Sequence, residues 1–328
     1  MHDLQRYLVE EFVEDYREGT LSRRDLLRRV LAVTGSVAIA ANALSRLGVR
    51  GPAAVRPAPA AARPPMQRPA RPDDDPMTDP PPMQTTANVV DPSDPLISVG
   101  MVTFSGPASD LYGYLAQPAT GGPYPGLILV HENRGLIEPN MDIARRYARL
   151  GYVVLVVDLA SRGGGTAALA AQDPVQVTGF LGQANPDDLT ADLLAGLDYL
   201  AGLGTVDANR LGATGFCFGG GMTWRLATAA PQLKAVVPYY GPNPPLDRVP
   251  NIRAAALGIY GELDTRITGA SAELDAALDA AGVVHDKVIE PNANHAFFNN
   301  TGPSYNPEAA LDAWRRTLAW FATYLPGT

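Results

Sequence analysis

Short apolar runs alternate with helical patterns from about residue 97 to the end of the chain. Ile97–Phe104 and Leu111–Gln117 are strand-like segments on either side of a polar turn, which predicts an antiparallel hairpin at a sheet edge. The continuous apolar runs of residues 126–132 and 152–158 are typical of strands buried on both faces. Further strands are predicted over residues 210–214, 235–240, 254–260 and 283–289.

Helical patterns lie between these strands. They cover residues around 141–148 and the ranges 187–202, 219–230, 270–281 and 308–324. This alternation predicts an α/β fold with a mostly parallel central sheet and helices on both faces. Functional residues then gather at the carboxyl ends of the strands. The connection from Ser161 to Pro186 is unusually long and glycine-rich, and we expect it to cover that site. A disordered surface insertion is the alternative for its middle part.

The first ninety residues have a different pattern. Residues 22–44 start with charged side chains, continue with a weakly apolar stretch and end in small residues, which is the layout of an export signal. Residues 22–27 (SRRDLL) resemble the twin-arginine signal pattern, and residues 41–43 (ANA) offer a cleavage site. The apolar stretch Val30–Leu44 is shorter than the roughly 20 residues that a membrane span needs.

Three regions are therefore expected: a twin-arginine-like signal segment over residues 1–43, a Pro/Ala-rich flexible linker over 44–88 and a folded α/β domain over 89–328. Export would place the protein in the periplasm or outside the cell. Its partner would be the twin-arginine export machinery, with membrane contact only through the signal. An uncleaved segment that tethers the protein to the membrane is the main alternative. Another is an amphipathic surface helix, because Leu4, Leu8, Phe12 and Tyr16 have helical spacing.

Charge is distributed unevenly along the chain. The formal net charge is −8, but residues 1–72 contain 12 arginines and 7 acidic residues, so they carry +5 and the remainder carries −13. An acidic body argues against a nucleic-acid-binding surface. A single cysteine excludes an internal disulfide, a Cys-rich zinc site and a CxxC redox pair, and the four histidines lack metal-motif spacing. No metal or other cofactor is expected.

The single cysteine, Cys217, lies in the motif GFCFG (215–219), between a predicted strand and a predicted helix. This context is typical of a nucleophile elbow, in which glycines are required because the tight turn leaves no room for neighbouring Cβ atoms. The start of the following helix favours a thiolate or an oxyanion. The alternative is a buried structural cysteine in a glycine-rich packing site.

Two later residues supply what an activated thiol needs, namely a base and a group that orients the base. Asp264 follows the predicted strand 254–260, and His295 follows the predicted strand 283–289. Both loops are expected at the same sheet edge as Cys217, and the chain order of nucleophile, acid and histidine is that of α/β-hydrolases. Three weaker candidates lie on or next to strands: Glu262 as the acid, and His131 and His285 as bases.

Five short motifs, in the same order, resemble the dienelactone hydrolase family of α/β-hydrolases over roughly residues 97–325. They are HENRG (131–135), DLASRGG (158–164), GFCFGG (215–220), GELD (261–264) and NHAF (294–297). The resemblance implies an α/β-hydrolase fold and a cofactor-independent carboxylic ester hydrolase. It implies that Cys217 is the nucleophile, His295 the base and Asp264 the orienting acid.

The resemblance also implies four supporting roles. Glu132 would contact the resting thiol, the backbone N–H groups of Phe218 and Asn133 would form the oxyanion hole, and Arg162 would bind a substrate carboxylate. A carboxylate beside the thiol disfavours a second negative charge, so the cysteine can stay neutral and resist oxidation until substrate moves Glu132 towards it to take the proton.

The sequence departs from the family pattern after the histidine. Residues 298–300 (FNN) stand where the family has a second carboxylate-binding arginine, which favours a neutral ester or a different lactone as substrate, unless Arg134 substitutes. The expected activity is hydrolysis of small esters or lactones through a Cys-His-Asp triad and a covalent acyl-enzyme. The alternatives are a thioesterase or peptidase-like acyl hydrolase, and a non-catalytic exported binding protein on a hydrolase fold.

Overall fold

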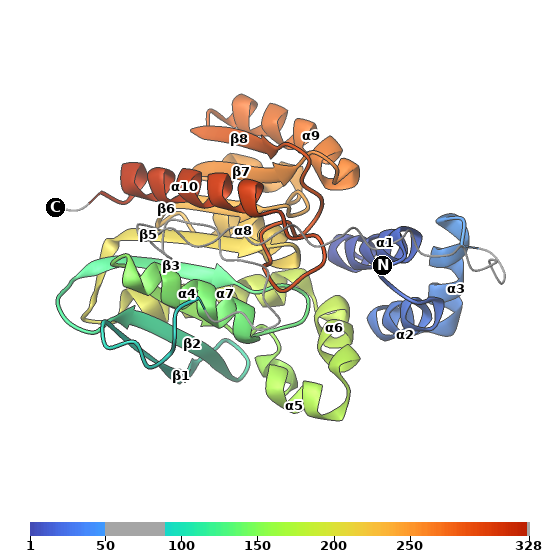
Figure 1. The fold of residues 1–328 in the computed structure, drawn as a ribbon, viewed down its shortest axis with the longest axis horizontal. Coiled ribbons are helices and arrows are strands. Elements are labelled where there is room, and N and C mark those ends of the chain that lie inside the picture. Colours follow the sequence, from blue (N-terminus) through green and yellow to red (C-terminus); the bar gives the residue numbers. More distant parts are fainter. Residues whose placement is uncertain (50–88, 327–328) are drawn as a thin grey trace, which may run out of the picture.

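A computed structural model describes residues 1–49 and 89–326 of the 328-residue chain, so most of the expected linker lies outside the described residues. Eight strands form one sheet in the order β1-β2-β4-β3-β5-β6-β7-β8 (Figure 1). Their bounds are β1 Ile97–Ser105, β2 Asp110–Pro118, β3 Tyr124–Val130, β4 Val153–Val157, β5 Val206–Phe216, β6 Leu233–Tyr239, β7 Ala255–Gly261 and β8 His285–Glu290.

Strand direction agrees with the sequence pattern. β1 pairs antiparallel with β2, and β2 pairs antiparallel with β4, so the predicted edge hairpin is confirmed. All pairs from β4 through β3, β5, β6 and β7 to β8 are parallel. The side chains of β4 and most of those of β3 are fully buried, because helices cover both faces of these central strands.

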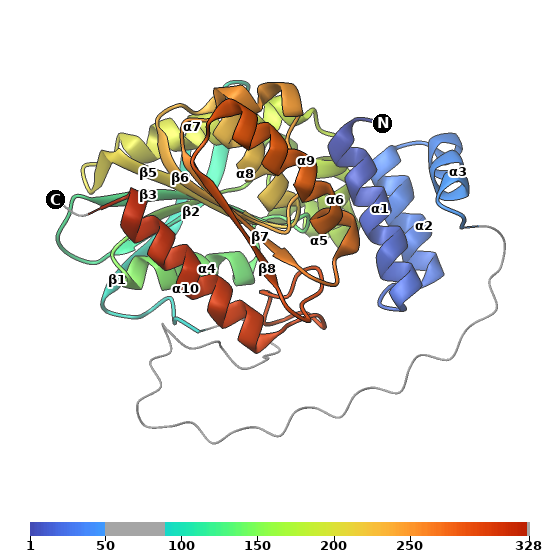
Figure 2. The same cartoon turned by 90° about the horizontal axis from the view of Figure 1, so that it is seen from above.

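Helices lie on both faces of the sheet, as predicted (Figure 2). On one face are α4 (Glu138–Arg149) and α10 (Pro307–Tyr324). On the other face are α7 (Pro186–Ala201), α8 (Phe218–Ala229) and α9 (Thr265–Ala281). A short 3-10 helix, η2 (Leu246–Asn251), follows β6. Because all parallel strands run in the same direction, the loops that follow β3, β5, β7 and β8 meet at one edge of the sheet.

The long connection after β4 is ordered and largely helical. It contains η1 (Ser161–Gly163), α5 (Thr166–Gln172) and α6 (Pro174–Gln183), where the glycine content had predicted a loop. The Asp173 side chain accepts a hydrogen bond from the Val175 N–H at 3.1 Å, and Pro174 occupies the first turn, so α6 has a strong start. The glycines do not end these helices, because two of them lie at a helix–helix contact described below.

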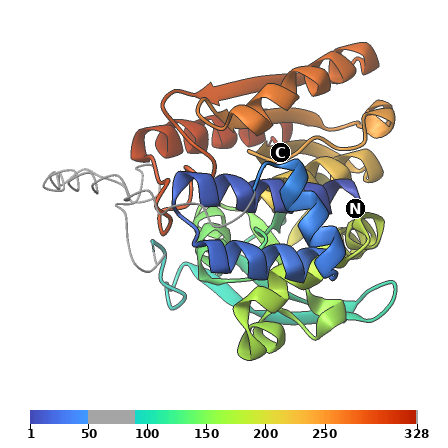
Figure 3. The ribbon, with the colours of Figure 1, turned by 90° about the vertical axis from the view of Figure 1, so that its right-hand side faces the viewer.

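Three helices precede the sheet: α1 (Asp3–Glu18), α2 (Arg23–Thr34) and α3 (Val37–Arg46). They lie against the carboxyl edge of the sheet, beside α6 (Figure 3). The side chains of His2, Ser22 and Ser36 cap their N-termini, and left-handed Gly19 and Gly35 end α1 and α2. The candidate cleavage site at residues 41–43 lies inside α3.

No helix in the described ranges is long and apolar enough to cross a membrane by itself. Together α2 and α3 have the length and composition of a span, but they meet at a bend of 119°. Leu4, Leu8 and Phe12 are at most 2% exposed, so the amphipathic pattern of the first helix buries an apolar face, and α1 contacts α2 and α6.

Candidate active site

Cys217 occupies a strained turn between β5 and α8. Its backbone has φ 59° and ψ −122°, a conformation that L residues rarely adopt. A Cβ atom on Gly215 would lie 2.5 Å from the Gly219 carbonyl oxygen, and one on Gly219 would lie 2.3 Å from that of Val130. Both positions therefore require glycine, and the turn directs the thiol to the carboxyl edge of the sheet.

Asp264 and His295 meet at the same edge. Asp264 follows β7, its side chain is 1% exposed, and its Oδ2 lies 2.6 Å from His295 Nδ1. Asp264 Oδ1 also accepts a hydrogen bond from the Ile267 N–H at 3.3 Å, which fixes the carboxylate at the start of α9. A nitrogen of the His295 ring and Cys217 Sγ lie within 4.8 Å of each other. The structure thus brings together the three residues that the motif order singled out.

The charges of this group depend on burial and on its neighbours. Burial, followed by the Glu11 carboxylate, raises the pKa of Cys217 to about 11, so the resting thiol is neutral at neutral pH. For His295, burial acts to lower the pKa, but the Asp264 carboxylate outweighs it and raises the pKa well above its ordinary value. Asp264 keeps a pKa below its ordinary value, because His295 offsets its burial.

The loop after β3 forms the opposite wall. Its Glu132 accepts a hydrogen bond from Asn299 Nδ2 at 3.2 Å, and burial raises the pKa of this carboxyl group. Within the described residues, no hydrogen bond joins Glu132 to the thiol. The Asn133 side chain donates to Glu11 Oε1 at 2.9 Å, and the Asn133 carbonyl accepts from Thr178 of α6 at 3.1 Å. Glu11, which also lies 3.5 Å from Cys217 Sγ, thus links Asn133 to the thiol.

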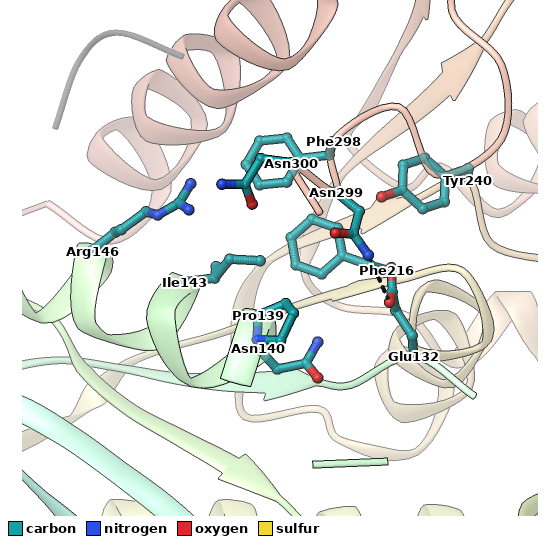
Figure 4. Close-up of a pocket in the computed structure, with 10 residues that line it drawn as sticks. All are labelled: Glu132, Pro139, Asn140, Ile143, Arg146, Phe216, Tyr240, Phe298, Asn299 and Asn300. Carbon is teal, nitrogen blue, oxygen red and sulfur yellow. Dashed lines mark hydrogen bonds between the residues drawn. The ribbon is translucent and has the colours of Figure 1, made fainter. Parts of the chain in front are cut away.

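A small cavity lies behind Glu132 (Figure 4). It measures about 10 Å³, which is room for roughly one water molecule. Its walls include Phe216 and Phe298, whose rings stack with centroids 5.1 Å apart, and Asn299, which reaches Glu132. Asn299, one of the three residues that stand where the resemblance implies an arginine, thus contacts a carboxylate of the protein itself.

Arg162 lies outside the group around Cys217. Its guanidinium donates two hydrogen bonds of 2.8 Å to the carboxylate of Asp192 on α7. It lines a cavity of about 420 Å³ whose other walls come from α5, α6 and α7. A role for Arg162 in substrate binding stays a prediction.

The weaker candidates have other partners. His131 is fully buried, accepts the Leu159 N–H at Nε2 over 3.1 Å and donates from Nδ1 to the Glu132 carbonyl oxygen at 2.7 Å. It therefore ties the ends of β3 and β4 together. Glu262 accepts the Asn292 N–H at 2.8 Å, and His285 lies on the edge strand β8.

Sequence reasoning missed two residues of this site, both from α1. The Tyr7 hydroxyl lies 3.3 Å from Cys217 Sγ and 3.5 Å from His295 Nε2. The carboxylate oxygens of Glu11 lie 3.5 and 3.6 Å from Sγ. Their four-residue spacing puts both on one helix face, but the apolar spacing of α1 alone does not reveal which surface that face contacts.

One set of potential metal ligands coincides with this site. Glu11, Cys217 and His295 each offer one atom within 4.8 Å of the others, and Zn²⁺ accepts such ligands. The same atoms make the hydrogen-bonding contacts described above.

Comparison with known proteins assigns the family. The model of the dienelactone hydrolase family matches residues 111–325. The chain belongs to the dienelactone hydrolase family. It is therefore a hydrolase of the carboxylic ester type with an α/β-hydrolase fold, as the sequence motifs predicted.

Relatives support this assignment over most of their length. A protein of Methylorubrum extorquens, provisionally named carboxymethylenebutenolidase, is 38% identical over 223 residues, which are 64% of this chain and 76% of the relative. One of Salmonella typhimurium with the same provisional name is 37% identical over 70% of this chain and 89% of its own. A crystal structure from Klebsiella pneumoniae, provisionally titled dienelactone hydrolase, has 33% identity and a TM-score of 0.64, and covers 70% of this chain and 99% of its own.

Proposed function

We propose that this member of the dienelactone hydrolase family hydrolyses small esters or lactones through a Cys217-His295-Asp264 triad and a covalent acyl-enzyme. The observation that carries this proposal is the convergence of the three groups: a thiol on a strained elbow, a histidine ring within 4.8 Å, and a buried carboxylate 2.6 Å from that ring. Family membership supports the reaction class. It also argues against a binding protein without catalytic activity.

The mechanism moves one proton at each stage. In its neutral form, His295 takes the thiol proton as Sγ attacks the ester carbonyl carbon and forms the S–C bond. The oxyanion accepts hydrogen bonds from the backbone N–H groups of Phe218 and Asn133. When the C–O bond breaks, His295 gives its proton to the leaving alcohol oxygen, and a thioester remains. Water then attacks this thioester, with His295 again as base, and releases the acid and the thiol.

Asp264 orients His295 during these steps. Its contact to Nδ1 holds the ring with Nε2 towards the thiol, and its charge stabilises the imidazolium that forms. Glu132 is a second proton acceptor in this proposal. Burial raises the pKa of Glu132. Asn299 binds its carboxylate until a substrate displaces Glu132 towards the thiol.

The substrate class follows from the polar groups at the site. Asn299 stands where a carboxylate-binding arginine is expected, and Arg162 is paired with Asp192. These two positions thus offer no free arginine for a substrate carboxylate, which favours a neutral ester or lactone unless the exposed Arg134, whose charge acts on Glu132, takes that role. A thioesterase or peptidase-like acyl hydrolase uses the same triad, and a panel of thioesters, amides and lactones distinguishes the two.

Turnover of an activated aryl ester tests the triad. The full chain should release p-nitrophenol from a short-chain p-nitrophenyl ester, and Cys217→Ala should release none above the uncatalysed rate. α1 covers the thiol, so the comparison is repeated with α1 displaced. Leu8→Asp is then compared with the double variant Leu8→Asp/Cys217→Ala. Mass spectrometry should detect an acyl adduct on Cys217 and none on the alanine variant. Equal turnover in the two chains contradicts the mechanism.

We also propose that the protein is exported, with residues 22–27 as the part that the twin-arginine machinery recognises. Arg23 and Arg24 are exposed at the start of α2, which supports this role. Replacement of both by lysine should leave the protein in the cytoplasm of a bacterial host, whereas the native chain appears in the periplasmic fraction. Export of the double variant at the native level contradicts the proposal.

A further inference from the structure

Helix α1 runs across the carboxyl edge of the sheet, in front of the loops that carry Cys217 and His295 (Figure 3). Leu4, Leu8 and Phe12 of α1 are between 0 and 2% exposed, and Tyr7, which faces the thiol, is 4% exposed. Only 4% of Cys217 is exposed to solvent in this arrangement. The catalytic group is therefore covered by a segment that lies outside the 111–325 match to the family.

Two α1 side chains occupy the space where the reaction must take place. An ester carbonyl has to come within about 3–3.5 Å of the sulfur before attack. The Tyr7 hydroxyl is 3.3 Å from Sγ, and it is also 3.5 Å from His295 Nε2, the atom that has to exchange protons. Glu11 also lies 3.5 Å from Sγ and accepts a hydrogen bond from the Asn133 side chain. A substrate cannot share these positions.

We propose that α1 is an intramolecular inhibitor of this hydrolase: while α1 is docked, Tyr7 and Glu11 fill the acyl site, and turnover requires α1 to leave. This inference rests on the proposed role of Cys217. It gives the N-terminal segment a function in regulating the enzyme that is separate from export.

The contacts around Tyr7 and Glu11 form a specific docking surface. The Arg266 guanidinium lies over the Tyr7 ring at 4.9 Å, and its Nε donates to Glu14 at 3.1 Å. Asn294, next to the catalytic histidine, donates to Glu18 at 3.1 Å, and Arg225 of α8 pairs with Asp3. These partners come from α8, α9 and the histidine loop, so the whole length of α1 is held.

Helix α2 is held in the same way by α6. A Cβ atom on Gly179 would lie 3.0 Å from Ala32, and one on Gly182 would lie 2.7 Å from Val33. The two glycines are three residues apart and face α2, so they allow the helices to approach closely. Gln183 donates to the Ala32 carbonyl oxygen at 2.6 Å, and Arg28 pairs with Asp173 at 2.5 Å. α6 thus has a surface that fits closely against α2.

Glu11 adds a second form of inhibition. Its carboxylate lies against the sulfur and disfavours a negative charge there, and burial under α1 acts in the same direction, so the thiol pKa is raised to about 11. Release of α1 removes both causes at once. The thiol then becomes more acidic and more reactive at neutral pH.

The experiment compares the full chain with Leu8→Asp, which places a charge in the buried face of α1 and leaves the α/β domain unchanged. The matched control is Arg6→Asp, because Arg6 is exposed on the same helix. Two rates are measured at neutral pH: kcat/KM for a p-nitrophenyl ester, and alkylation of Cys217 by iodoacetamide, which does not depend on hydrolysis. Both are expected to rise at least tenfold in Leu8→Asp and to stay at the full-chain level in Arg6→Asp.

A second variant tests the proposal independently if Leu8→Asp fails to fold. Gly182→Leu acts from α6, where the added side chain collides with Val33 and displaces α2. It should also raise both rates, and urea unfolding verifies that the α/β domain is intact. A rise in alkylation without ester hydrolysis in any chain supports the inhibitor and refutes the proposed hydrolytic role of Cys217. Unchanged alkylation in both folded variants, or lower turnover with faster alkylation, overturns the inhibitor.

Discussion

At the scale of residues, the contact between Asp264 and His295 determines how the base functions. The carboxylate is almost fully buried, with one oxygen 2.6 Å from Nδ1 and the other accepting the Ile267 N–H, so its geometry is fixed. A buried carboxylate in this position raises the pKa of the histidine and holds its second nitrogen towards the sulfur.

We expect Asp264→Asn to lower kcat by about 10²–10⁴-fold, because the base loses its orientation and the imidazolium loses its counter-charge. The same change lowers the pKa of His295, so the acid limb of the kcat/KM profile moves to lower pH. Ester turnover followed from about pH 5 to about pH 9 measures both effects. Glu262→Gln is the matched control, because Glu262 binds only the Asn292 amide among the described residues. A larger loss in this control than in Asp264→Asn would transfer the acid role to Glu262.

Glu11 allows a separate test of charge at the sulfur. Glu11→Gln keeps the size of the side chain but removes the carboxylate that raises the pKa of Cys217. The thiol pKa is expected to fall below about 11, so the alkylation rate at a fixed pH rises and its pH profile moves to lower pH. The measurement is iodoacetamide alkylation as a function of pH, with Arg6→Asp as the control. A profile that moves to higher pH contradicts this account of the thiol.

At the scale of elements, the β5–α8 turn is the most constrained part of the site. Cys217 has a positive φ, and a Cβ added to Gly215 or Gly219 would lie only 2.3–2.5 Å from backbone carbonyl oxygens. Backbone atoms cannot give way as a flexible side chain can. The motif GFCFG is therefore a geometric requirement, which is why it was readable in the sequence.

We expect Gly219→Ala to lower the free energy of unfolding by about 2–4 kcal/mol, because the new methyl group collides with the carbonyl oxygens of Val130 and His131. Gly100→Ala in β1 is the control, since a Cβ there meets nothing within 4 Å, and it should change stability by less than about 1 kcal/mol. Urea denaturation followed by circular dichroism measures both. Equal urea midpoints for Gly219→Ala and the native chain would show that the turn accommodates the methyl group without loss of stability.

At the scale of the whole molecule, the N-terminal helices and the α/β domain form one body in the described residues. Arg225–Asp3, Arg266–Glu14 and Arg28–Asp173 tie the two parts together around the buried apolar face of α1. In each pair at least one side chain is a third or more exposed to solvent. Salt screens the attraction in such exposed pairs.

Salt is therefore expected to loosen the docking. Between about 0.05 M and about 0.5 M NaCl, alkylation of Cys217 in the native chain should increase by roughly two- to fivefold. In Leu8→Asp, where α1 is already displaced, the rate should not change. The measurement is the iodoacetamide rate at constant pH. A decrease with salt in the native chain would show that these ion pairs do not hold α1.

Part of the molecule could be predicted because its signals are local. Period-two and continuous apolar runs predicted the strands, the glycine spacing predicted the elbow, and the chain order of Cys217, Asp264 and His295 predicted which loops would meet. Parallel strands bring their carboxyl ends to one edge, so the order of motifs along the chain is enough to assemble this trio.

The rest needed the tertiary structure, because its partners are far apart in sequence and carry no shared pattern. The glycine-rich connection became α5 and α6, since the glycines that weaken a helix in isolation allow α2 to pack closely here. The paired state of Arg162 depends on Asp192, thirty residues away.

The sequence by itself determined the fold class, the thiol on a tight turn and the two residues that meet beside it, because each follows from local sterics and strand direction. Only the tertiary structure decided that the first helix lies on the thiol. The sequence of residues 1–43 is compatible with a signal, an anchor or a surface helix. Its apolar positions could be buried by the export machinery, by a membrane or by the rest of the protein. Its docking depends on the matching surface formed by α6, α8, α9 and the histidine loop, which exists only after the chain has folded.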